Sequence, residues 1–516
     1  MDTNLDNTKR VRVRFAPSPT GPLHIGGVRT ALYNFLFAKK MGGDFLLRIE
    51  DTDQNRFVPG AEDYIIEALN WCGIKIDEGV SVGGPFAPYK QSERKPLYRQ
   101  YAENLISAGH AYYAFDTPEE LDTMREKLTQ GGMASPQYNY VTRESMKNSL
   151  TMAHDQVQEY LEKGEPYVIR IKIPRKEEVR VVDLIRGNVI VHTSQMDDKV
   201  LFKSDGMPTY HLANVVDDYL MKITHVIRGE EWLPSAPLHV LLYKYLGWEK
   251  EMPQFAHLPL LLKPDGNGKL SKRDGDRLGF PVFPLEWIDP SSGEKSSGYR
   301  EMGYFSEAVV NLLALLGWNP GSNQEIFSMD ELIQAFTIER ISKSGAKFDL
   351  NKAKWFNQQY LRAYSEESLA KTFQAELKEK NLDAPIDYLI KVIHLIKEKA
   401  HFSKEFWSLS TYFFENPKEY DAPSLEKKWN AESKTFLENL EKKLSVLENF
   451  VSSQIETSYQ ETAQSMEIKP GNMMQITRVA ITGVNLGPAL FDTLEVLGKE
   501  KVLERIHLAL SNFPKI

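Results

Sequence analysis

Residues 11–27, VRVRFAPSPTGPLHIGG, carry the strongest indication of how this chain folds. Residues 11–16 alternate apolar and charged side chains, which is typical of a short β-strand, and Pro17 to Gly21 then interrupt the run. From 27 to 41 apolar residues recur at helical spacing, and a pair of glycines follows as a stop. Strand, glycine-rich turn and helix are therefore predicted to form one unit.

Strand and helix patterns alternate beyond this unit. Residues 45–50 indicate a second strand and 60–71 a second helix, which is the βαβ order of a parallel sheet. Residues 112–201 mix a charged helical stretch with strand-like runs, so we interpret them as an inserted domain. The βα order returns at 209–246, and after about Phe280 the apolar residues fall at helical spacing almost throughout.

These patterns predict an α/β protein with several domains, as expected for a chain of 516 residues. The predicted segments are 1–110 and 206–263 for the two halves of a parallel-sheet domain, 111–205 for an inserted α+β domain, 264–335 for a segment that carries a basic loop, and 336–516 for a helical domain.

The composition predicts a cytoplasmic protein that neither crosses a membrane nor coats nucleic acid. Cys72 is the only cysteine, which excludes an intramolecular disulfide and a cysteine-rich zinc site. The longest apolar stretch, 308–318, is too short for a bilayer span. The formal net charge of −8 argues against indiscriminate binding of phosphates, but it leaves room for a local basic face that binds RNA.

The turn at 17–27 has the composition of a nucleotide-binding loop. Small residues let a nucleotide approach the backbone, and the free N–H groups at a helix start favour phosphate oxygens. His24 adds a donor that can follow charge onto a transferring phosphoryl group. The alternative is a glycine and proline turn with an incidental histidine, which Gly26 and Gly27 taken alone would favour.

Residues 269–273, KLSKR, form a basic segment that follows the turn-forming residues 264–268, PDGNG. Three cations on a mobile loop can bind a triphosphate, and a positioned ammonium is most useful as charge builds up in the transition state of phosphoryl transfer. Lys272 is the residue that we expect to take this role. A solvated basic turn is the alternative.

Other side chains are suited to a small charged ligand. Glu50 closes the second predicted strand, where ligands of parallel sheets gather, and it can receive an ammonium group. If 204–218 is helical, Tyr210 and Asn214 project from one face. Arg228 follows a strand and offers a guanidinium at the sheet edge. Taken singly, Tyr210 and Asn214 are more often core-capping residues, and Arg228 is more often a surface ion-pair partner.

Three motifs together resemble those of a known enzyme family. The string 17–27 resembles the HIGH element of class I aminoacyl-tRNA synthetases, and its Ala-Pro-Ser-Pro-Thr-Gly lead-in resembles the glutamyl and glutaminyl branch. KLSKR resembles the family's KMSKS loop. Residues 475–483 resemble the segment of the bacterial anticodon-binding domain that reaches the anticodon. The last HIGH position is Gly27 instead of histidine, a departure that the glutamyl branch tolerates.

The resemblance implies a Rossmann-like catalytic domain, an inserted acceptor-binding domain, and all-α stem-contact and anticodon-binding domains. It implies a monomeric glutamate–tRNA ligase that activates L-glutamate with ATP and Mg²⁺ and transfers it to tRNA(Glu), with tRNA needed for the first step. A non-discriminating enzyme that also charges tRNA(Gln) stays open. A paralogue that glutamylates a modified tRNA base lacks the helical C-terminal third, and an RNA-binding scaffold would not need the catalytic motifs.

The resemblance also implies roles for individual residues. The expected catalytic residues are His24 and Lys272. The expected ATP-binding residues are Pro17, Thr20, Gly21, His24, Gly26, Gly27, Glu231, Lys269, Leu270, Ser271, Lys272 and Arg273. The expected glutamate-binding residues are Arg14, Ser18, Glu50, Tyr210, Asn214 and Arg228, with Ser18 and Glu50 at the α-carboxylate and α-amino groups. Gln475 and Arg478 are expected to bind the anticodon, and Lys399 stands near a position where many relatives have an arginine.

This chain departs from the family at two further places. Some relatives hold zinc in the inserted domain through cysteines, and no cysteine occurs between residues 98 and 201, so we expect no zinc. After the basic motif the chain carries an extra stretch around 279–301, rich in aromatic residues and proline and ending in serine and glycine. We interpret it as an inserted loop beside the basic motif.

Overall fold

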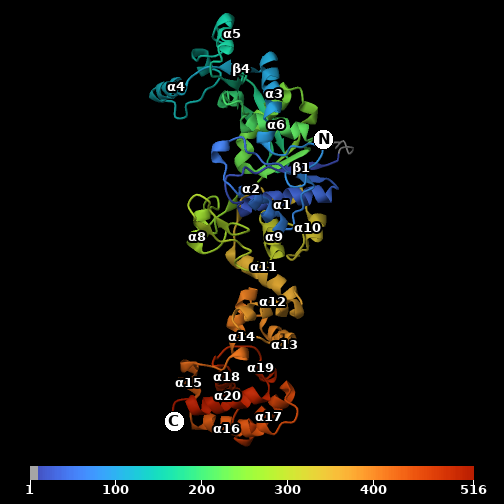
Figure 1. The fold of residues 1–516 in the computed structure, drawn as a ribbon, viewed down its shortest axis with the longest axis vertical. Coiled ribbons are helices and arrows are strands. Elements are labelled where there is room, and N and C mark those ends of the chain that lie inside the picture. The colour runs from blue at the N-terminus through green and yellow to red at the C-terminus, as the bar shows by residue number, and fades with distance from the viewer. Residues whose placement is uncertain (1–9, 516) are drawn as a thin grey trace. The chain divides into compact units, whose positions relative to one another are not determined.

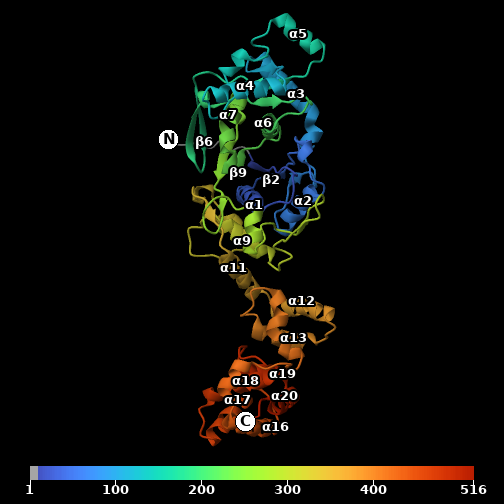
Figure 2. The same ribbon diagram turned by 90° about the vertical axis from the view of Figure 1, so that its left-hand side faces the viewer.

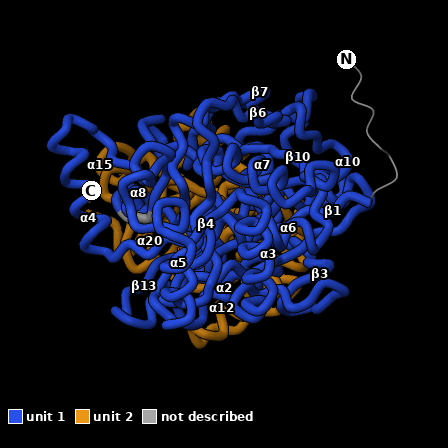
Figure 3. Tube along the Cα trace, turned by 90° about the horizontal axis from the view of Figure 1, so that it is seen from above, with its two compact units in different colours: residues 1–302, 306–352 blue, residues 303–305, 353–516 orange. Residues whose placement is uncertain are grey.

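Two compact units make up the chain in the computed structural model. It describes residues 10–515, apart from the side chains of Lys272 and Asp276. The first unit comprises the residues up to 302 together with 306–352, and the second comprises 303–305 and the residues from 353 onward (Figure 3). Each unit has apolar core residues of its own.

A seven-stranded sheet forms the centre of the first unit. Its strands follow the spatial order β3-β2-β1-β9-β10-β6-β7 and pair in parallel, except that β6 and β7 are antiparallel. The strand bounds are β1 Arg12–Phe15, β2 Asp44–Leu47, β3 Glu78–Gly79, β6 Glu178–Asp183, β7 Gly187–His192, β9 His225–Gly229 and β10 Gln254–Leu258. The predicted parallel sheet is therefore confirmed.

Helices cover both faces of this sheet (Figure 1, Figure 2). Helix α1 (Ile25–Lys40) packs on β1, β2 and β9, while α6 (Tyr210–Leu220) and α7 (Ala236–Tyr245) pack together on the other side. Helix α2 (Ala61–Trp71) follows β2, and α3 (Lys95–Ser107) packs against α6. This doubly wound arrangement confirms the strand, turn and helix unit predicted from residues 11–41.

The alternation in β1 has a different meaning from the one expected of a half-exposed strand. Val13 and Phe15 are buried, and Arg14 between them is only 3% exposed. Because helices cover both faces, the charged side chain of β1 lies in the interior, where Asp218 of α6 pairs with it. An apolar and charged alternation here marks two buried faces of different chemistry.

The inserted segment divides between two sheets. Strands β4 (Ala111–Ala114), β5 (Val168–Ile171) and β8 (Val200–Phe202) form a separate three-stranded antiparallel sheet, with α4 (Pro118–Gln130) and α5 (His154–Glu162) in the same segment. The hairpin of β6 and β7 instead joins the central sheet, where Asp183 pairs with Phe255 of β10. Periodicity could not reveal this, because strand partners more than 70 residues away decide sheet membership.

Residues 259–305 form an irregular segment beside α1. Strand β11 (Leu261–Leu262) pairs with β14 (Ala346–Lys347), α8 (Lys272–Leu278) is short, and β12 (Trp287–Ile288) pairs with β13 (Lys295–Ser296). Phe283 and Gly298 form a parallel bridge where the chain enters and leaves the extra loop. A proline-rich loop occupies the interval that we interpret from the sequence as an inserted loop, and the helical structure expected from about Phe280 onward begins with α9 (Ser306–Leu315).

Helices make up the rest of both units. The first unit continues with α9 (Ser306–Leu315) and α10 (Met329–Ala335), whereas α11 (Leu350–Ala363) has its first residues in the first unit and the others in the second. The second unit contains α12 (Glu366–Glu379), α13 (Ile386–Ile396), α14 (Phe406–Phe414), α15 (Ala422–Lys428), α16 (Ala431–Ser445), α17 (Ser452–Ser465), α18 (Pro470–Thr482), α19 (Leu490–Leu497) and α20 (Lys499–Asn512) around one apolar core. Among the described residues no helix has the length and apolarity that a membrane crossing requires.

Asp217 of α6 holds together three elements of the first unit. Its carboxylate, fully buried, accepts hydrogen bonds from Gln91, from Arg94 at 2.7 Å and from the Tyr98 hydroxyl at 2.8 Å. Removing the charge leaves Arg94 buried without its counterion. We therefore expect Asp217→Asn to lower the free energy of unfolding of the first unit by about 3 kcal/mol.

Chemical denaturation of the full chain, followed by a probe in the first unit, measures this loss. Asp122→Asn is the matched control, because the Asp122–Arg125 ion pair is exposed and should contribute little. Equal midpoints for Asp217→Asn and the unchanged chain would contradict the assignment.

Candidate functional site

His24 caps the N-terminus of α1 directly after the glycine-rich turn. Its Nδ1 accepts a hydrogen bond from the Gly26 N–H at 3.0 Å, so the ring proton of the neutral imidazole is on Nε2. Nε2 is buried and has no hydrogen-bond partner within the described part of the chain. Burial, and to a smaller degree the Lys269 cation, lower the pKa of His24 to about 4. His24 is thus a neutral N–H donor that lacks an acceptor.

The start of α1 offers fewer free N–H groups than the sequence led us to expect. The Ile25 N–H donates to the carbonyl of Val282 at 2.9 Å, and the Gly26 N–H is used by His24. Val282, in the extra segment after the basic motif, therefore accepts from one of the N–H groups that we expected to be free for phosphate. Since this pairing joins residues 257 positions apart, no local pattern could have indicated it.

Gly27 leaves room for neighbouring apolar side chains at the position where the HIGH motif ends. A Cβ placed there would lie 2.5 Å from Leu23 Cδ1 and 3.6 Å from the ring of Phe15. A larger residue would have to displace the Leu23 side chain and would lie against Phe15 at the end of β1. Glycine here is thus explained by packing between the turn and the strand.

The KLSKR segment is half loop and half helix. Leu270 is buried and donates its N–H to Leu261 at 2.8 Å, which anchors the segment to β11. Ser271 caps α8 through reciprocal hydrogen bonds with Asp274, so the helix starts at Lys272 and leaves Arg273 exposed. The side chain of Lys272, our strongest candidate for catalysis, lies outside the described residues.

Three expected ATP-binding residues converge on one place. Lys269 pairs with the Glu231 carboxylate at 2.8 Å, and its positive charge contributes to the lowered pKa of His24. Burial raises the pKa of Glu231, but the hydrogen bond and charge of Lys269, a backbone hydrogen bond and the charge of Arg29 together outweigh it, so the net pKa is lowered. The HIGH turn, the segment after β9 and the KLSKR segment therefore meet at a common site.

The other expected ATP-binding residues lie in the turn before His24. Thr20 is exposed, while Pro17 and Gly21 are partly buried. The carbonyl of Pro17 accepts the Glu50 N–H at 3.0 Å, which ties the turn to the carboxyl end of β2. Ser18 is exposed beside it.

A buried ionic network lies next to this turn. Arg14 donates to both oxygens of Asp218 through Nε and Nη2, at 3.0 and 3.2 Å. Arg48 bridges Asp218 at 2.7 Å and Glu50 at 2.8 Å, and Asn214 donates to the same Glu50 oxygen at 3.0 Å. Burial raises the pKa of Asp218, but the two guanidinium groups outweigh it and the net pKa is lowered. The network leaves Glu50 Oε2 and Arg14 Nη1 outside these contacts.

Arg228 differs from the other two arginines because it lacks a counterion. Its side chain is 5% exposed, and no carboxylate of the described residues lies within 4.0 Å of it. Nη1 donates to the Tyr210 hydroxyl at 2.7 Å and Nε donates to His257 at 3.0 Å. Tyr210 is a helical turn away from Asn214 on α6, as predicted, and its ring packs on Trp232. A buried cation in this position favours an anionic ligand.

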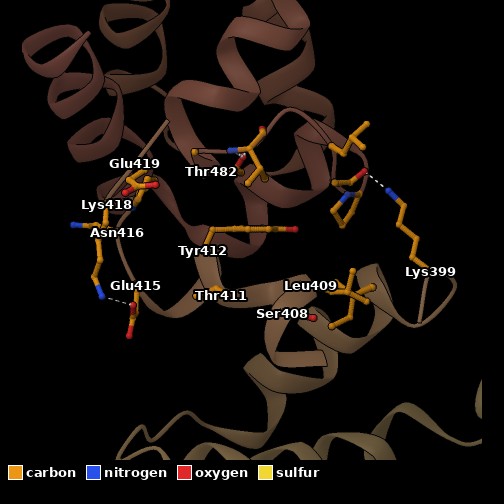
Figure 4. A pocket seen from close by; sticks show the side chains of 17 residues that line it. Lys399, Ser408, Leu409, Thr411, Tyr412, Glu415, Asn416, Lys418, Glu419 and Thr482 are labelled. Atoms are coloured by element: carbon orange, nitrogen blue, oxygen red, sulfur yellow. Dashed lines mark hydrogen bonds and ion pairs between the residues drawn. The ribbon is translucent and has the colours of Figure 1, made fainter. Parts of the chain in front are cut away.

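A second site is a cavity of about 650 Å³ in the second unit. It opens among the end of α13, α14 and the 482–488 loop, and Figure 4 shows the Tyr412 ring lying across it, with Lys399 and Lys418 at opposite ends. Lys399 donates to the carbonyl of Gly487. Leu486 on the rim is 80% exposed. The cavity combines exposed apolar groups with cations.

Of the two expected anticodon-binding residues, only one carries an unsatisfied group. Arg478 lies in α18 with a buried Nη1 that has no hydrogen-bond partner among the described residues, and the same holds for the Tyr412 hydroxyl. A Cβ on Gly487 would lie 2.9 Å from that Nη1, which places Arg478 beside the cavity wall. Gln475 instead donates to Ser424 at 2.8 Å.

The sequence interpretation passed over several residues that shape the first site. Arg48 and Asp218 hold the ionic network, and His257 contacts Arg228 and is itself held by Asp183. A signal for them existed: Arg48 directly follows the apolar strand β2, His257 lies within the apolar strand β10, and Asp218 is one helical turn from Asn214 on α6. Charged residues in such positions indicate buried ion pairs. Among the described residues no cluster of three or more histidine, cysteine or carboxylate side chains is placed to hold a metal ion.

Two known families match almost the whole chain. Residues 10–355 match the family described as tRNA synthetases class I (E and Q), catalytic domain. Residues 352–510 match the family described as anticodon binding domain. The two matched ranges follow each other along the chain.

Relatives also match this chain over almost its full length. The chain is 59% identical over 506 residues to the glutamate–tRNA ligase of Cytophaga hutchinsonii, with 98% of each chain covered. It is 55% identical over 502 residues to that of Amoebophilus asiaticus, with 97% of this chain and 98% of the relative covered. The crystal structure of a glutamate tRNA ligase from Elizabethkingia meningosepticum in complex with its amino acid has a TM-score of 0.95 and 49% identity, covering 98% of this chain and all of that one.

The protonation of His24 is directly testable. Because its pKa is lowered to about 4, the imidazole should stay neutral from pH 8 down to about pH 5. The unfolded chain binds this proton first, near the ordinary value of 6.5, so stability from this group declines as the pH falls below 6.5. NMR of histidine-labelled protein should show the His24 ring among those that do not titrate in this range, together with His211 and His225, whose pKa values burial also lowers to about 4.

Comparison with His24→Gln assigns that resonance, because its signal disappears in the variant. A His24 ring that titrates near pH 6.5 would contradict a buried neutral donor.

Proposed function

Because this chain belongs to the class I tRNA synthetases of the glutamate and glutamine type, we propose that its first unit activates glutamate with ATP and its second unit binds the tRNA that receives it. The chain is a glutamate–tRNA ligase, as its full-length relatives are. The roles of individual residues in the two steps of that reaction are part of the proposal. The observation that carries these roles is the buried Arg228 guanidinium without a counterion.

The side-chain carboxylate of glutamate is proposed to bind Arg228 and Tyr210. The Tyr210 hydroxyl accepts a hydrogen bond from Arg228, so its own proton is available to a carboxylate oxygen. Arg14 contributes Nη1, the nitrogen that Asp218 does not use. Glutamine would present an amide N–H₂ to these donors, so the pocket discriminates by charge and by hydrogen-bond direction.

The α-amino group is proposed to bind Glu50. Arg48 and Asn214 both hold Oε1 of this carboxylate, which orients Oε2 toward an ammonium. Ser18 lies across the turn that is tied to Glu50 through Pro17, and it is proposed to bind the α-carboxylate. The reacting carboxylate would then lie near the HIGH turn.

ATP, as its Mg²⁺ complex, is proposed to bind between the HIGH turn and the KLSKR segment. The neutral Nε2–H of His24 lacks an acceptor and suits a phosphate oxygen. Pro17, Thr20, Gly21, Gly26 and Gly27 would form the floor of this site. Lys269 to Arg273, together with Glu231, would form its basic side, with Lys272 at the transferring phosphate.

The reaction then needs no protein nucleophile. An oxygen of the glutamate α-carboxylate attacks the α-phosphorus of ATP, the bond to the bridging oxygen breaks, and pyrophosphate leaves. A hydroxyl of the tRNA 3′-terminal ribose attacks the carbonyl carbon of the adenylate, and AMP leaves. Positioning and charge stabilisation by His24 and Lys272 supply the proposed catalysis.

The tRNA is proposed to contact several segments. The cavity of the second unit suits unstacked anticodon bases, because the Tyr412 ring offers a stacking surface and Arg478 offers an unused donor. Gln475 lies in the same helix. Segments 111–205 and 264–335 are proposed to bind the acceptor end and the stem, and 336–516 the anticodon. Family membership also favours a monomer in the cytoplasm.

Pyrophosphate exchange and charging test the proposal. We expect glutamate-dependent exchange only when tRNA is added, and charging of tRNA(Glu). Purified tRNA(Gln), assayed in parallel, distinguishes a discriminating enzyme from one that charges both. Glutamate-dependent exchange without tRNA would contradict the predicted tRNA requirement, and no exchange under either condition would overturn the proposed reaction.

Arg228 is expected to set the affinity for glutamate. Arg228→Leu removes two charged hydrogen bonds, so we expect the KM for glutamate to rise about 100-fold, with the KM for ATP unchanged. Steady-state charging at varied glutamate measures the effect. Arg99→Leu, which removes an exposed arginine paired with Glu103, serves as the control. A glutamate KM close to that of the unchanged enzyme would remove Arg228 from the pocket.

A further inference from the structure

Arg228 is one end of a chain of buried side chains that crosses the central sheet. His257 of β10 is fully buried between Arg228 and Asp183 of β6. Its Nδ1 lies 2.6 Å from Asp183 Oδ2, and its Nε2 accepts from Arg228 Nε at 3.0 Å. The three residues come from three adjacent strands, β6, β10 and β9.

The hydrogen-bond partners determine the tautomer of His257. Arginine has five N–H donors and no acceptor, so Nε2 must present its lone pair to Arg228. The ring proton is therefore on Nδ1, where the Asp183 carboxylate accepts it. Burial and the Arg228 cation keep the pKa of His257 below its ordinary value, in spite of Asp183. A second ring proton would direct Nε2–H against the Arg228 Nε–H.

Asp183 is itself fixed by the backbone. Its Oδ1 accepts the N–H groups of Ile185 at 2.9 Å and Arg186 at 2.8 Å, while Oδ2 accepts the His257 N–H at 3.1 Å as well as the ring. Burial raises the pKa of Asp183, but these hydrogen bonds, that of His257 first, outweigh it and lower the net pKa. Asp183 is thus an ionised acceptor that cannot rotate without losing several bonds.

This arrangement determines which edge of Arg228 faces a ligand. Nε is held by His257, Nη1 contacts Tyr210, and Nη2 makes only a long contact of 3.4 Å with the Trp232 carbonyl. A bidentate carboxylate can therefore meet only the edge formed by the two terminal nitrogens. A guanidinium free to rotate about its last bonds would also offer the edge formed by Nε and one terminal nitrogen. The pairing of β6, β10 and β9 does not require these side-chain contacts, because backbone groups complete it.

We propose that His257 and Asp183 are positioning residues for substrate selection: they hold the Arg228 fork in the one orientation that meets the glutamate side chain. The inference rests on the proposed role of Arg228. It predicts that losing either residue weakens glutamate binding and the preference over glutamine, although neither residue touches the substrate.

Three variants separate the contributions of His257 and Asp183. His257→Phe keeps the ring shape and removes both nitrogens. His257→Gln can return an acceptor near the position of Nε2. In Asp183→Asn the side-chain oxygen is held by the N–H groups of Ile185 and Arg186, so its amide N–H₂ faces His257 Nδ1 and forces the proton to Nε2, against Arg228.

We expect His257→Phe and Asp183→Asn to raise the KM for glutamate about 10-fold or more, the weight of one charged hydrogen bond. The ratio of kcat/KM for glutamate over glutamine should fall by a similar factor, while the KM for ATP stays unchanged. His257→Gln should recover part of both effects. His394→Phe, which breaks a histidine–carboxylate pair in the second unit, is the control and should change neither.

The outcomes distinguish this inference from the function it rests on. If Arg228→Leu raises the glutamate KM but His257→Phe and Asp183→Asn do not, the positioning role is overturned and the Arg228 pocket stands. If Arg228→Leu has no effect either, the proposed pocket fails. Equal increases in the KM for glutamate and for ATP would mean general damage to the sheet and would also overturn the positioning role.

Discussion

The proposed amino acid pocket depends on a buried cation that no carboxylate of the described residues compensates. Arg228 lies in the interior, and its guanidinium contacts only neutral groups of the described residues, namely Tyr210, His257 and the Trp232 carbonyl. Removing such a charge from water costs several kcal/mol unless an anion compensates it. In the proposed pocket the substrate supplies this anion, and selectivity for an acidic side chain would arise from the charge that the described residues leave uncompensated.

The neighbouring charges show the opposite arrangement. Arg14 and Arg48 share Asp218, and Arg48 also reaches Glu50, so two cations are balanced by two carboxylates within one buried network. This balance holds Glu50 in place without consuming both of its oxygens. Two kinds of buried arginine thus occur in the first unit. Arg14 and Arg48 are compensated by protein carboxylates, whereas Arg228 is proposed to be compensated by a ligand. In the sequence these residues look alike.

Local patterns predicted the parts of the molecule that local interactions determine. The strand, turn and helix at 11–41 and the helical pairing of Tyr210 with Asn214 follow from periodicity and turn chemistry. The Val282 carbonyl on Ile25, the place of β6 in the central sheet, and the contact of Asp183 with His257 do not, since each joins residues far apart in sequence. Motifs pointed to the proposed site residues, whereas no motif pointed to the residues that hold them in place.

The bridge between Phe283 and Gly298 bears on how relatives of this chain can diverge. The chain enters and leaves the intervening loop at neighbouring points, so the bridge holds the two loop ends together whatever the length of the loop. Each doubling of such a loop adds only about 0.6 kcal/mol of closure entropy. Insertions and deletions between these residues can therefore accumulate in evolution without moving Val282 from the first amide of α1, and loop length here is a poor guide to kinship.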